Sequence, residues 1–173
     1  REEGNYHRAR QYLSESLDLS RRIGSRSDEA RSLLNLGIVR YQTGAHDKAL
    51  ELFQQALELS EELGNEHSPL QIYYNMGNVY LEQERFDLAE DAYRASLEMS
   101  DELRSGHGQF YNNLGIGNVR LAHNEYEEAI GHYLKALELA GQFESGEMQK
   151  LVLDKLIRAY EERGDYSSAY RYL

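Results

Sequence analysis

The sequence predicts an all-α protein, an α-α superhelix built as a solenoid of antiparallel helix pairs. Alanine recurs every 40 residues, at Ala9, Ala49, Ala89, Ala129 and Ala169, and a fixed period of this length is the signature of a repeat architecture. The chain has 14 glycines but a single proline, which favours long helices that end at glycine. Valine and isoleucine are too sparse for many strands.

Each 40-residue unit contains two helical patterns. In the first complete unit, Leu33 and Leu36 belong to an apolar pattern with helical spacing that ends near Gly44, and we name this helix A. A second pattern begins before Ala49 and closes at Gly64, and we name it helix B. One such pair cannot bury both apolar stripes, so neighbouring pairs are expected to stack into a continuous core.

The repeat register gives the position of every helix. We expect A helices over residues 28–43, 68–83, 108–123 and 147–163. We expect B helices over residues 6–23, 46–63, 86–103 and 126–142, with a fifth beginning near residue 166. The chain is predicted to be one domain, 1–173, with units 1–26, 27–66, 67–106, 107–146 and 147–173, of which the first and last are partial. Because residue 1 is not Met and the first unit lacks helix A, we expect a fragment whose first helix is its most mobile or most aggregation-prone part.

Small residues mark the helix crossings. Gly37 of helix A is expected to face Ala49 of helix B, so that no side chain holds the two helices apart. Gly115 has no such packing reason in the sequence, and we interpret it as a weak point in its helix or as an opening toward a ligand backbone. His67 and His107 precede successive A helices, where we expect them to serve as linker or capping residues.

Composition excludes several classes of protein. The chain is 40% hydrophobic and 28% charged with a mean hydropathy of -0.73, as in soluble folded proteins, and no apolar run is long enough for a membrane helix. Because there is no cysteine, disulfides are excluded and a cytoplasmic location is expected. The net charge of -11 repels phosphate backbones, so we expect no nucleic-acid partner, and the lack of a long apolar run leads us to expect no membrane partner.

The repeat residues resemble the tetratricopeptide repeat over the whole chain. Its helix A motif is present as Leu36-Gly37, Met76-Gly77 and Ile116-Gly117, with Tyr80 at the tyrosine position of the second unit. Its helix B motif is present in the three complete units as Ala49, Phe53 and Ala56, as Ala89, Tyr93 and Ser96, and as Ala129, Tyr133 and Ala136. The 40-residue period resembles the long repeats of Pins/LGN-type adaptors and of bacterial Rap-type peptide-sensing regulators.

This resemblance implies a protein or peptide partner, bound as an extended or partly helical segment in a concave groove lined by the A helices. The implied groove residues, taken unit by unit, are Arg31, Leu34, Ile38 and Tyr41; Gln71, Tyr74, Asn78 and Leu81; Tyr111, Leu114, Asn118 and Leu121; and Leu151, Asp154 and Arg158. In the Pins/LGN type, two residues of helix A contact the ligand. One is an Asn directly after the motif glycine, matched here by Asn78 and Asn118, and the other is an Arg six residues before the motif glycine, matched here by Arg31.

An asparagine amide both donates and accepts, so Asn78 and Asn118 suit the N–H and C=O groups of a peptide backbone. The alternative is that both amides bond to neighbouring repeats or to water. Asn35 and Asn75 lie two residues before the motif glycines Gly37 and Gly77, and we expect them to be structural amides between repeats.

We expect no enzyme, no catalytic residue, no metal and no cofactor. The sequence has no phosphate-binding loop, nucleophile elbow, dinucleotide fingerprint or His-Glu-x-x-His string. The carboxylate-clamp subtype of the repeat is disfavoured, because its lysine positions are occupied by Leu34, Ile38, Asn75, Tyr111 and Gly115. The alternative to peptide binding is a structural spacer, or a regulatory array within a larger signalling protein that self-associates through its ends.

Overall fold

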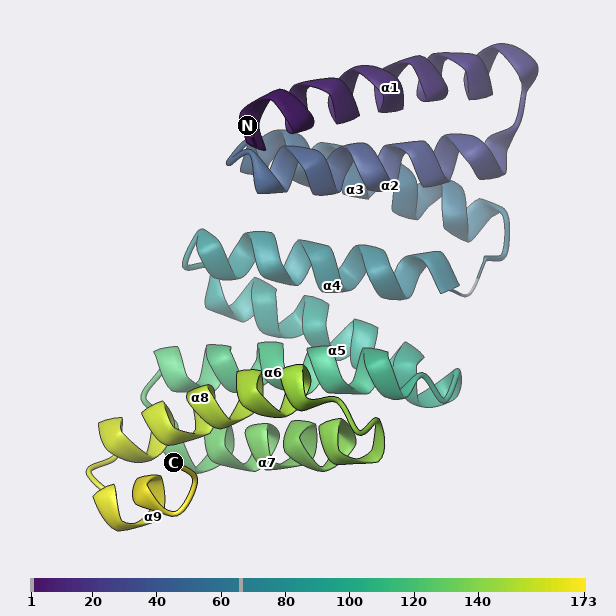
Figure 1. Cartoon of the computed structure of the whole chain (residues 1–173). Helices are drawn as coiled ribbons and strands as arrows, with labels where there is room; N and C mark the ends of the chain where they lie inside the picture. The colour runs from purple at the N-terminus through teal and green to yellow at the C-terminus, as the bar shows by residue number, and fades with distance from the viewer. Residues whose placement is uncertain (1, 66) are drawn as a thin grey trace. The chain divides into compact units, whose positions relative to one another are not determined.

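The computed structural model describes residues 2–65 and 67–173, and the described residues form nine α-helices and no strand (Figure 1). The all-α repeat fold predicted from the sequence is confirmed. The chain divides into two compact units, Arg1–Gln83 and Glu84–Leu173, each of which is described by itself.

The helix bounds follow the predicted register. The first unit contains α1 (Glu2–Ile23), α2 (Arg26–Gln42), α3 (His46–Glu62) and α4 (His67–Glu82). The second contains α5 (Phe86–Glu102), α6 (Gly106–Ala122), α7 (Tyr126–Gln142), α8 (Gly146–Glu162) and α9 (Tyr166–Tyr170). The A helices, α2, α4, α6 and α8, begin one or two residues before their predicted starts, and α1 begins before residue 6.

Successive helices are joined by tight turns in which one residue takes the left-handed conformation. Glycine occupies this position at 24, 44, 64 and 164, where its lack of a Cβ makes a positive φ inexpensive. At the equivalent places further along the chain, Glu84, Arg104, Asn124 and Glu144 have φ values of 57°, 51°, 62° and 52°. Glu84, Arg104 and Glu144 store local strain of about 1–2 kcal/mol each, whereas asparagine adopts this conformation more readily.

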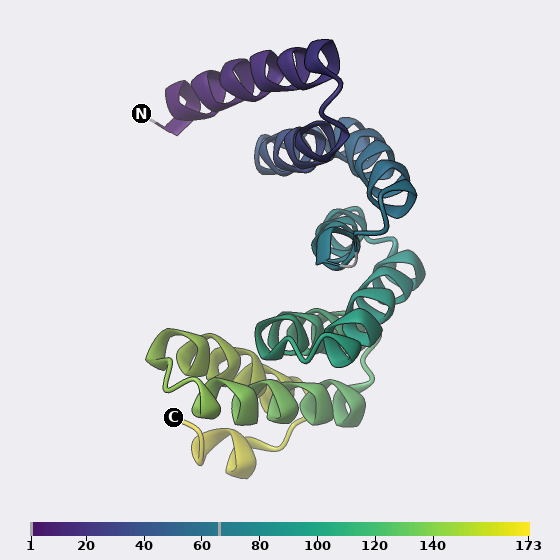
Figure 2. The same cartoon turned by 90° about the vertical axis from the view of Figure 1, so that its right-hand side faces the viewer.

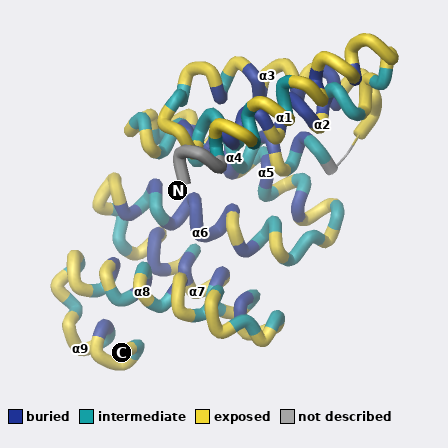
Figure 3. The backbone as a smooth tube through the Cα atoms, turned by 45° about the horizontal axis from the view of Figure 1, so that its top comes forward, coloured by how far each residue is buried: buried dark blue, intermediate teal, exposed yellow. Residues whose placement is uncertain are grey.

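In each unit, consecutive helices lie side by side (Figure 2). In the first unit, α2 packs against α1 and α3 and also contacts α4, and the interior contains the fully buried side chains of Phe53 and Ile72. In the second unit, α6 lies between α5 and α7 and is buried along much of its length (Figure 3). The core of the second unit includes Phe110, Tyr133 and Leu156, and none of these side chains is accessible to solvent.

The glycines of the A helices accommodate aromatic rings. A Cβ on Gly37 would lie 2.5 Å from Cε1 of Phe53, so the ring of Phe53, which the expected Gly37–Ala49 crossing did not include, fills the space beside this glycine. A Cβ on Gly115 would lie 2.7 Å from Cε1 of Tyr93. The interpretation of Gly115 as a residue without a packing reason was therefore also wrong, because its partner ring belongs to the preceding helix, α5.

A polar contact fixes the same register between two helix pairs, one in each unit. Between α1 and α2, the hydroxyl oxygens of Ser16 and Ser32 lie 3.0 Å apart. Between α5 and α6, Asn112 Nδ2 donates to Ser96 Oγ over 2.8 Å. Ser16 and Ser96 hold equivalent repeat positions, as do Ser32 and Asn112, so helix B meets the following helix A in the same way in both units.

Candidate functional site

In the first unit, the residues expected to line a groove lie on α2 and α4, two A helices in direct contact. Arg31 and Gln71 are exposed, and Ile38, Tyr41, Tyr74, Asn78 and Leu81 are partly buried, so all seven present some surface. Leu34 is the exception, with 6% of its surface exposed. Its side chain contributes to the interior, which corrects its placement in the groove.

Tyr41 joins three helices of the first unit. Its hydroxyl donates to Glu82 Oε1 of α4 over 2.7 Å, and its ring lies 5.9 Å from the ring of His46 on α3. Glu82 is shared, because its Oε2 lies 3.1 Å from Nε2 of His46. Burial, followed by the hydrogen bond and charge of Glu82 and a smaller contribution from Tyr74, raises the pKa of Tyr41 above its ordinary value. Tyr41 is therefore a neutral donor that holds α2 against α4.

In the second unit, the predicted residues of α6 and α8 meet around a tyrosine of α7. The hydroxyl of Tyr133 donates to Asn118 Oδ1 over 3.0 Å. Burial raises the pKa of Tyr133, and the charge of Arg158 acts in the opposite direction. Arg158 in turn donates through Nε to Glu162 over 2.7 Å. Asn118 therefore has a structural partner, and its Oδ1 is engaged within the fold.

Two more predicted groove residues are corrected by their burial. Leu114 and Leu121 each have 8% of their surface exposed and belong to the core that packs α6 on α7. The other predicted positions of this unit keep accessible surface: Tyr111 and Leu151 are 39% and 40% exposed, and Asp154 is also exposed. The sequence spacing placed the leucines beside the accessible face, but the neighbouring helix covers them.

The other asparagines and histidines singled out in the sequence lie in different environments. Asn75 donates to the carbonyl oxygen of Gln71 in its own helix over 2.7 Å, and Asn35 is exposed, so the described contacts give neither amide a bond to another repeat. His107 was expected to precede helix A as a linker or capping residue, but it is the second residue of α6, and its ring stacks on that of Phe143 with 4.3 Å between centroids. The side chain of His67 lies outside the described residues.

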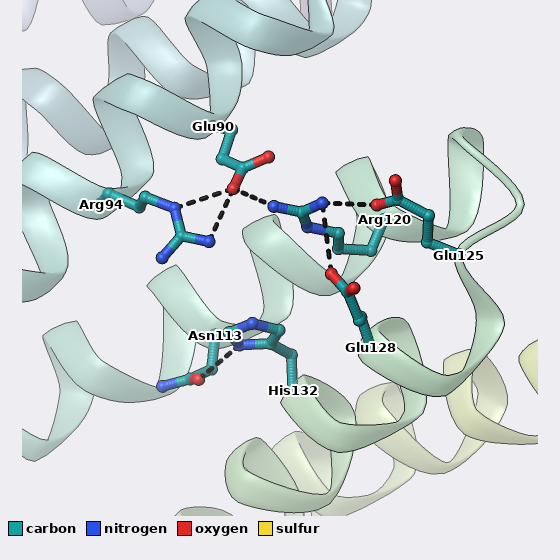
Figure 4. Close-up of polar contacts among 7 residues, drawn as sticks. All are labelled: Glu90, Arg94, Asn113, Arg120, Glu125, Glu128 and His132. Carbon is teal, nitrogen blue, oxygen red and sulfur yellow. Dashed lines mark hydrogen bonds and ion pairs between the residues drawn. The ribbon is translucent and has the colours of Figure 1, made fainter.

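An ion-pair network centred on Arg120 was not foreseen from the sequence (Figure 4). Its guanidinium contacts Glu90 of α5 and Glu125 at the start of α7, and Nη1 lies 3.2 Å from Glu128. Arg94 also pairs with Glu90, at 2.7 Å. Burial alone would raise the pKa of Glu90, but the hydrogen bonds and charges of Arg94 and Arg120 lower it below its ordinary value. The sequence feature that could have indicated this network is Arg120 itself, because it stands at the repeat position that Tyr80 occupies in the preceding repeat.

His132 lies beside this network on α7. Its Nδ1 is 2.9 Å from Asn113 Oδ1, and Asn113 Nδ2 donates to the carbonyl of Gln109. Burial, reinforced by the positive charges of Lys135, Arg94 and Arg120, lowers the pKa of His132 to about 4. The imidazole is therefore neutral near pH 7 and donates its Nδ1 proton to Asn113.

The described part of the chain contains no group of three or more His, Cys, Asp or Glu residues able to hold a metal ion. Two open hollows, of about 260 and 300 Å³, lie at equivalent repeat positions in the two units. They are lined by a mixture of charged, amide and leucine side chains. Among the described helices, none is long and apolar enough to cross a membrane.

Comparison with known proteins identifies the family. The sequence model of the tetratricopeptide repeat matches three overlapping segments, residues 1–62, 29–102 and 68–142. The chain belongs to the tetratricopeptide repeat family. A search of curated proteins finds no match. Tetratricopeptide repeats are in general protein-interaction scaffolds and are typically non-catalytic.

Solved structures show the same fold at low sequence identity. BtubC from P. vanneervenii has a TM-score of 0.89 at 21% identity, over 99% of this chain and 72% of that one. The apo form of RapI has a TM-score of 0.81 at 19% identity, over 98% of this chain and 65% of that one. The TPR-like repeats of a putative kinesin light chain from Podosopora anserina reach 0.77 at 13% identity, over 99% and 85%. This chain therefore spans somewhat less than two thirds of the RapI chain.

Proposed function

We propose that this tetratricopeptide repeat chain binds an extended or partly helical peptide segment of a partner protein on the exposed side chains of its A helices, without catalysing a reaction. The observation that carries the proposal is the direct contact of α2 with α4, which brings accessible side chains of two repeats together. The hydrogen bond from Tyr41 to Glu82 holds these helices in place before a ligand arrives. A preformed surface of this kind loses little entropy on binding.

The chemistry of this surface suits a peptide. Gln71 and Asn78 of α4 are amides that match peptide N–H and C=O groups, and Ile38 and Tyr74 offer partly buried apolar area beside them. Leu81 extends the apolar part by one helical turn beyond Asn78. Backbone hydrogen bonds would supply affinity and the apolar side chains would supply selectivity.

The test begins with peptides selected from a random library, followed by calorimetry on the selected peptide. The double variant Gln71→Ala/Asn78→Ala should lose about 1–3 kcal/mol, a roughly 5- to 150-fold weaker Kd, if each amide contributes about 0.5–1.5 kcal/mol. The control, Glu61→Gln/Glu62→Gln on exposed positions of α3, should keep the affinity. If the control abolishes binding and the amide variant does not, the A-helix surface is not the binding site.

A second candidate function is self-association, and exposed apolar residues of α1 favour it. Tyr12, Leu19 and Ile23 are 69%, 53% and 64% exposed and are spaced by seven and four residues, so they share one helix face. Leu59, which holds the repeat position of Leu19, is 7% exposed. Sedimentation of the wild-type chain and of Leu19→Glu/Ile23→Glu tests whether a second copy covers this face. A monomeric wild type at all concentrations would exclude it.

A further inference from the structure

The network around Arg120 shows which ligand this position of the repeat accepts. The Arg120 side chain is 18% exposed, and its guanidinium is contacted by three carboxylates, from Glu90, Glu125 and Glu128 (Figure 4). Its Nε is buried without a partner, so the Nη atoms make all of these contacts. An arginine in this position, between helix B, the following helix A and the next helix B, therefore binds carboxylates through its two Nη groups.

The first unit contains the same arginine without those carboxylates. Arg40 occupies the place of Arg120, and its Nε is likewise buried without a partner. The Ser16–Ser32 contact shows that α1 meets α2 in the register in which α5 meets α6. The three carboxylate positions are therefore occupied, in order, by Arg10, Ala45 and Lys48.

The result is a positively charged position in a chain of net charge -11. Arg10 and Arg40 are both partly buried, and among the residues that the structure describes no carboxylate pairs with either. Lys48 pairs with the exposed Glu51 of its own helix. Arg40, whose Nε is buried, and the partly buried Arg10 would both gain from a ligand that supplies the missing negative charge, because hydrogen bonds to a charged partner are stronger than neutral ones.

We propose that Arg10 and Arg40 form a docking position for an acidic segment of a partner protein, which places a glutamate or aspartate carboxylate where the carboxylate of Glu90 lies in the second unit. The site lies at the junction of α1 and α2, and it does not depend on peptide binding by the A-helix amides. It supplies specificity for acidic sequence in a protein whose net negative charge otherwise repels such sequence.

The test is a titration of isotope-labelled protein with a hexaglutamate peptide, followed through the arginine Nε–H resonances. Arg10→Glu supplies a carboxylate from the chain itself and should weaken peptide binding at least tenfold. The matched control is Arg8→Glu, which makes the same charge change on an exposed position of the same helix and should stay within about twofold of the wild type. Shifts at Arg10 and Arg40 that Arg10→Glu abolishes support the site. If Arg10→Glu and Arg8→Glu weaken peptide binding equally, the peptide responds only to the long-range electric field of the chain, and the proposed site is wrong.

Two further measurements make the result unambiguous. Inorganic phosphate at matched ionic strength should compete poorly with the peptide; equally effective competition would show a general anion site and overturn the assignment to acidic protein segments. Arg10→Glu should also melt at a higher temperature than Arg8→Glu, because it places a carboxylate opposite Arg40 as Glu90 stands opposite Arg120. A lower melting temperature would show that the two units differ in register and would remove the basis of the proposal.

Discussion

Replacing Gly115 by alanine should destabilise the chain, although alanine is the better helix former. The added Cβ would lie 2.7 Å from both Cε1 and Cζ of Tyr93 and 2.9 Å from Cδ1, inside van der Waals contact with a ring that has no accessible surface. Overpacking of this kind costs about 1–3 kcal/mol. Replacing a mid-helix glycine by alanine stabilises the helix by about 0.5–1 kcal/mol, so a net loss of stability of up to about 2.5 kcal/mol is expected.

Gly131 provides the internal control, since it lies within α7, is exposed, and would have nothing within 4 Å of an added Cβ. Gly131→Ala should therefore stabilise by about 0.5–1 kcal/mol. The assay is urea denaturation followed by circular dichroism, and the difference between the two variants isolates the clash. Tyr93→Leu should rescue Gly115→Ala in a double-mutant cycle with a coupling of about 1 kcal/mol or more. If Gly115→Ala stabilises as much as Gly131→Ala, the ring of Tyr93 does not pack on this glycine and the reasoning fails.

Three other outcomes are expected. Asn118→Ala should cost about 1–3 kcal/mol in urea denaturation, because it leaves the buried Tyr133 hydroxyl unpaired, and adding Tyr133→Phe should recover part of that loss. Arg104→Gly should raise the free energy of unfolding by about 1 kcal/mol, because Arg104 has a φ of 51°; an unchanged value would show that the turn stores no strain. The pKa of His132 is about 4 in the fold and lies near 6.5 in the unfolded chain. The neutral imidazole therefore contributes fully to the free energy of unfolding above about pH 6.5, and this contribution is lost as the pH falls toward 4. His132→Asn should flatten the pH dependence of the melting temperature over that interval, and an unchanged slope would contradict the shift.

The sequence was sufficient for the helices because their signals are local and repeated. Apolar spacing sets each helix, and glycine at 24, 44, 64 and 164 ends four of them. The other left-handed turns could not be predicted from residue type, since Glu84, Arg104 and Glu144 are unfavourable there. They are held by the packing of the helices on either side, which is a tertiary effect.

The candidate site was predicted less well, because the errors involve contacts between repeats. Leu34, Leu114 and Leu121 have the spacing of accessible residues on helix A, but packing against other helices buries them. Gly115 lacked a partner within its own 40-residue repeat, because the ring that fills its space belongs to α5 of the preceding repeat. A repeat pattern gives the position of each residue in its helix, whereas exposure depends on the particular neighbours.

The 40-residue repeat conserves the packing of the helices more strictly than it conserves charge, so the two units carry different charges at equivalent positions. A ring must meet a glycine at the helix crossing, so Phe53 with Gly37 and Tyr133 with Gly117 preserve the same geometry. A partly exposed charged position has no such steric requirement. One unit therefore neutralises its arginine internally, as at Arg120, whereas in the other unit the residues at the equivalent carboxylate positions are Arg10, Ala45 and Lys48. Under the two proposals made above, the selectivity of this scaffold would arise at the helix junctions as well as on the A-helix surface, because a charge at a junction can change without altering the packing of the helices.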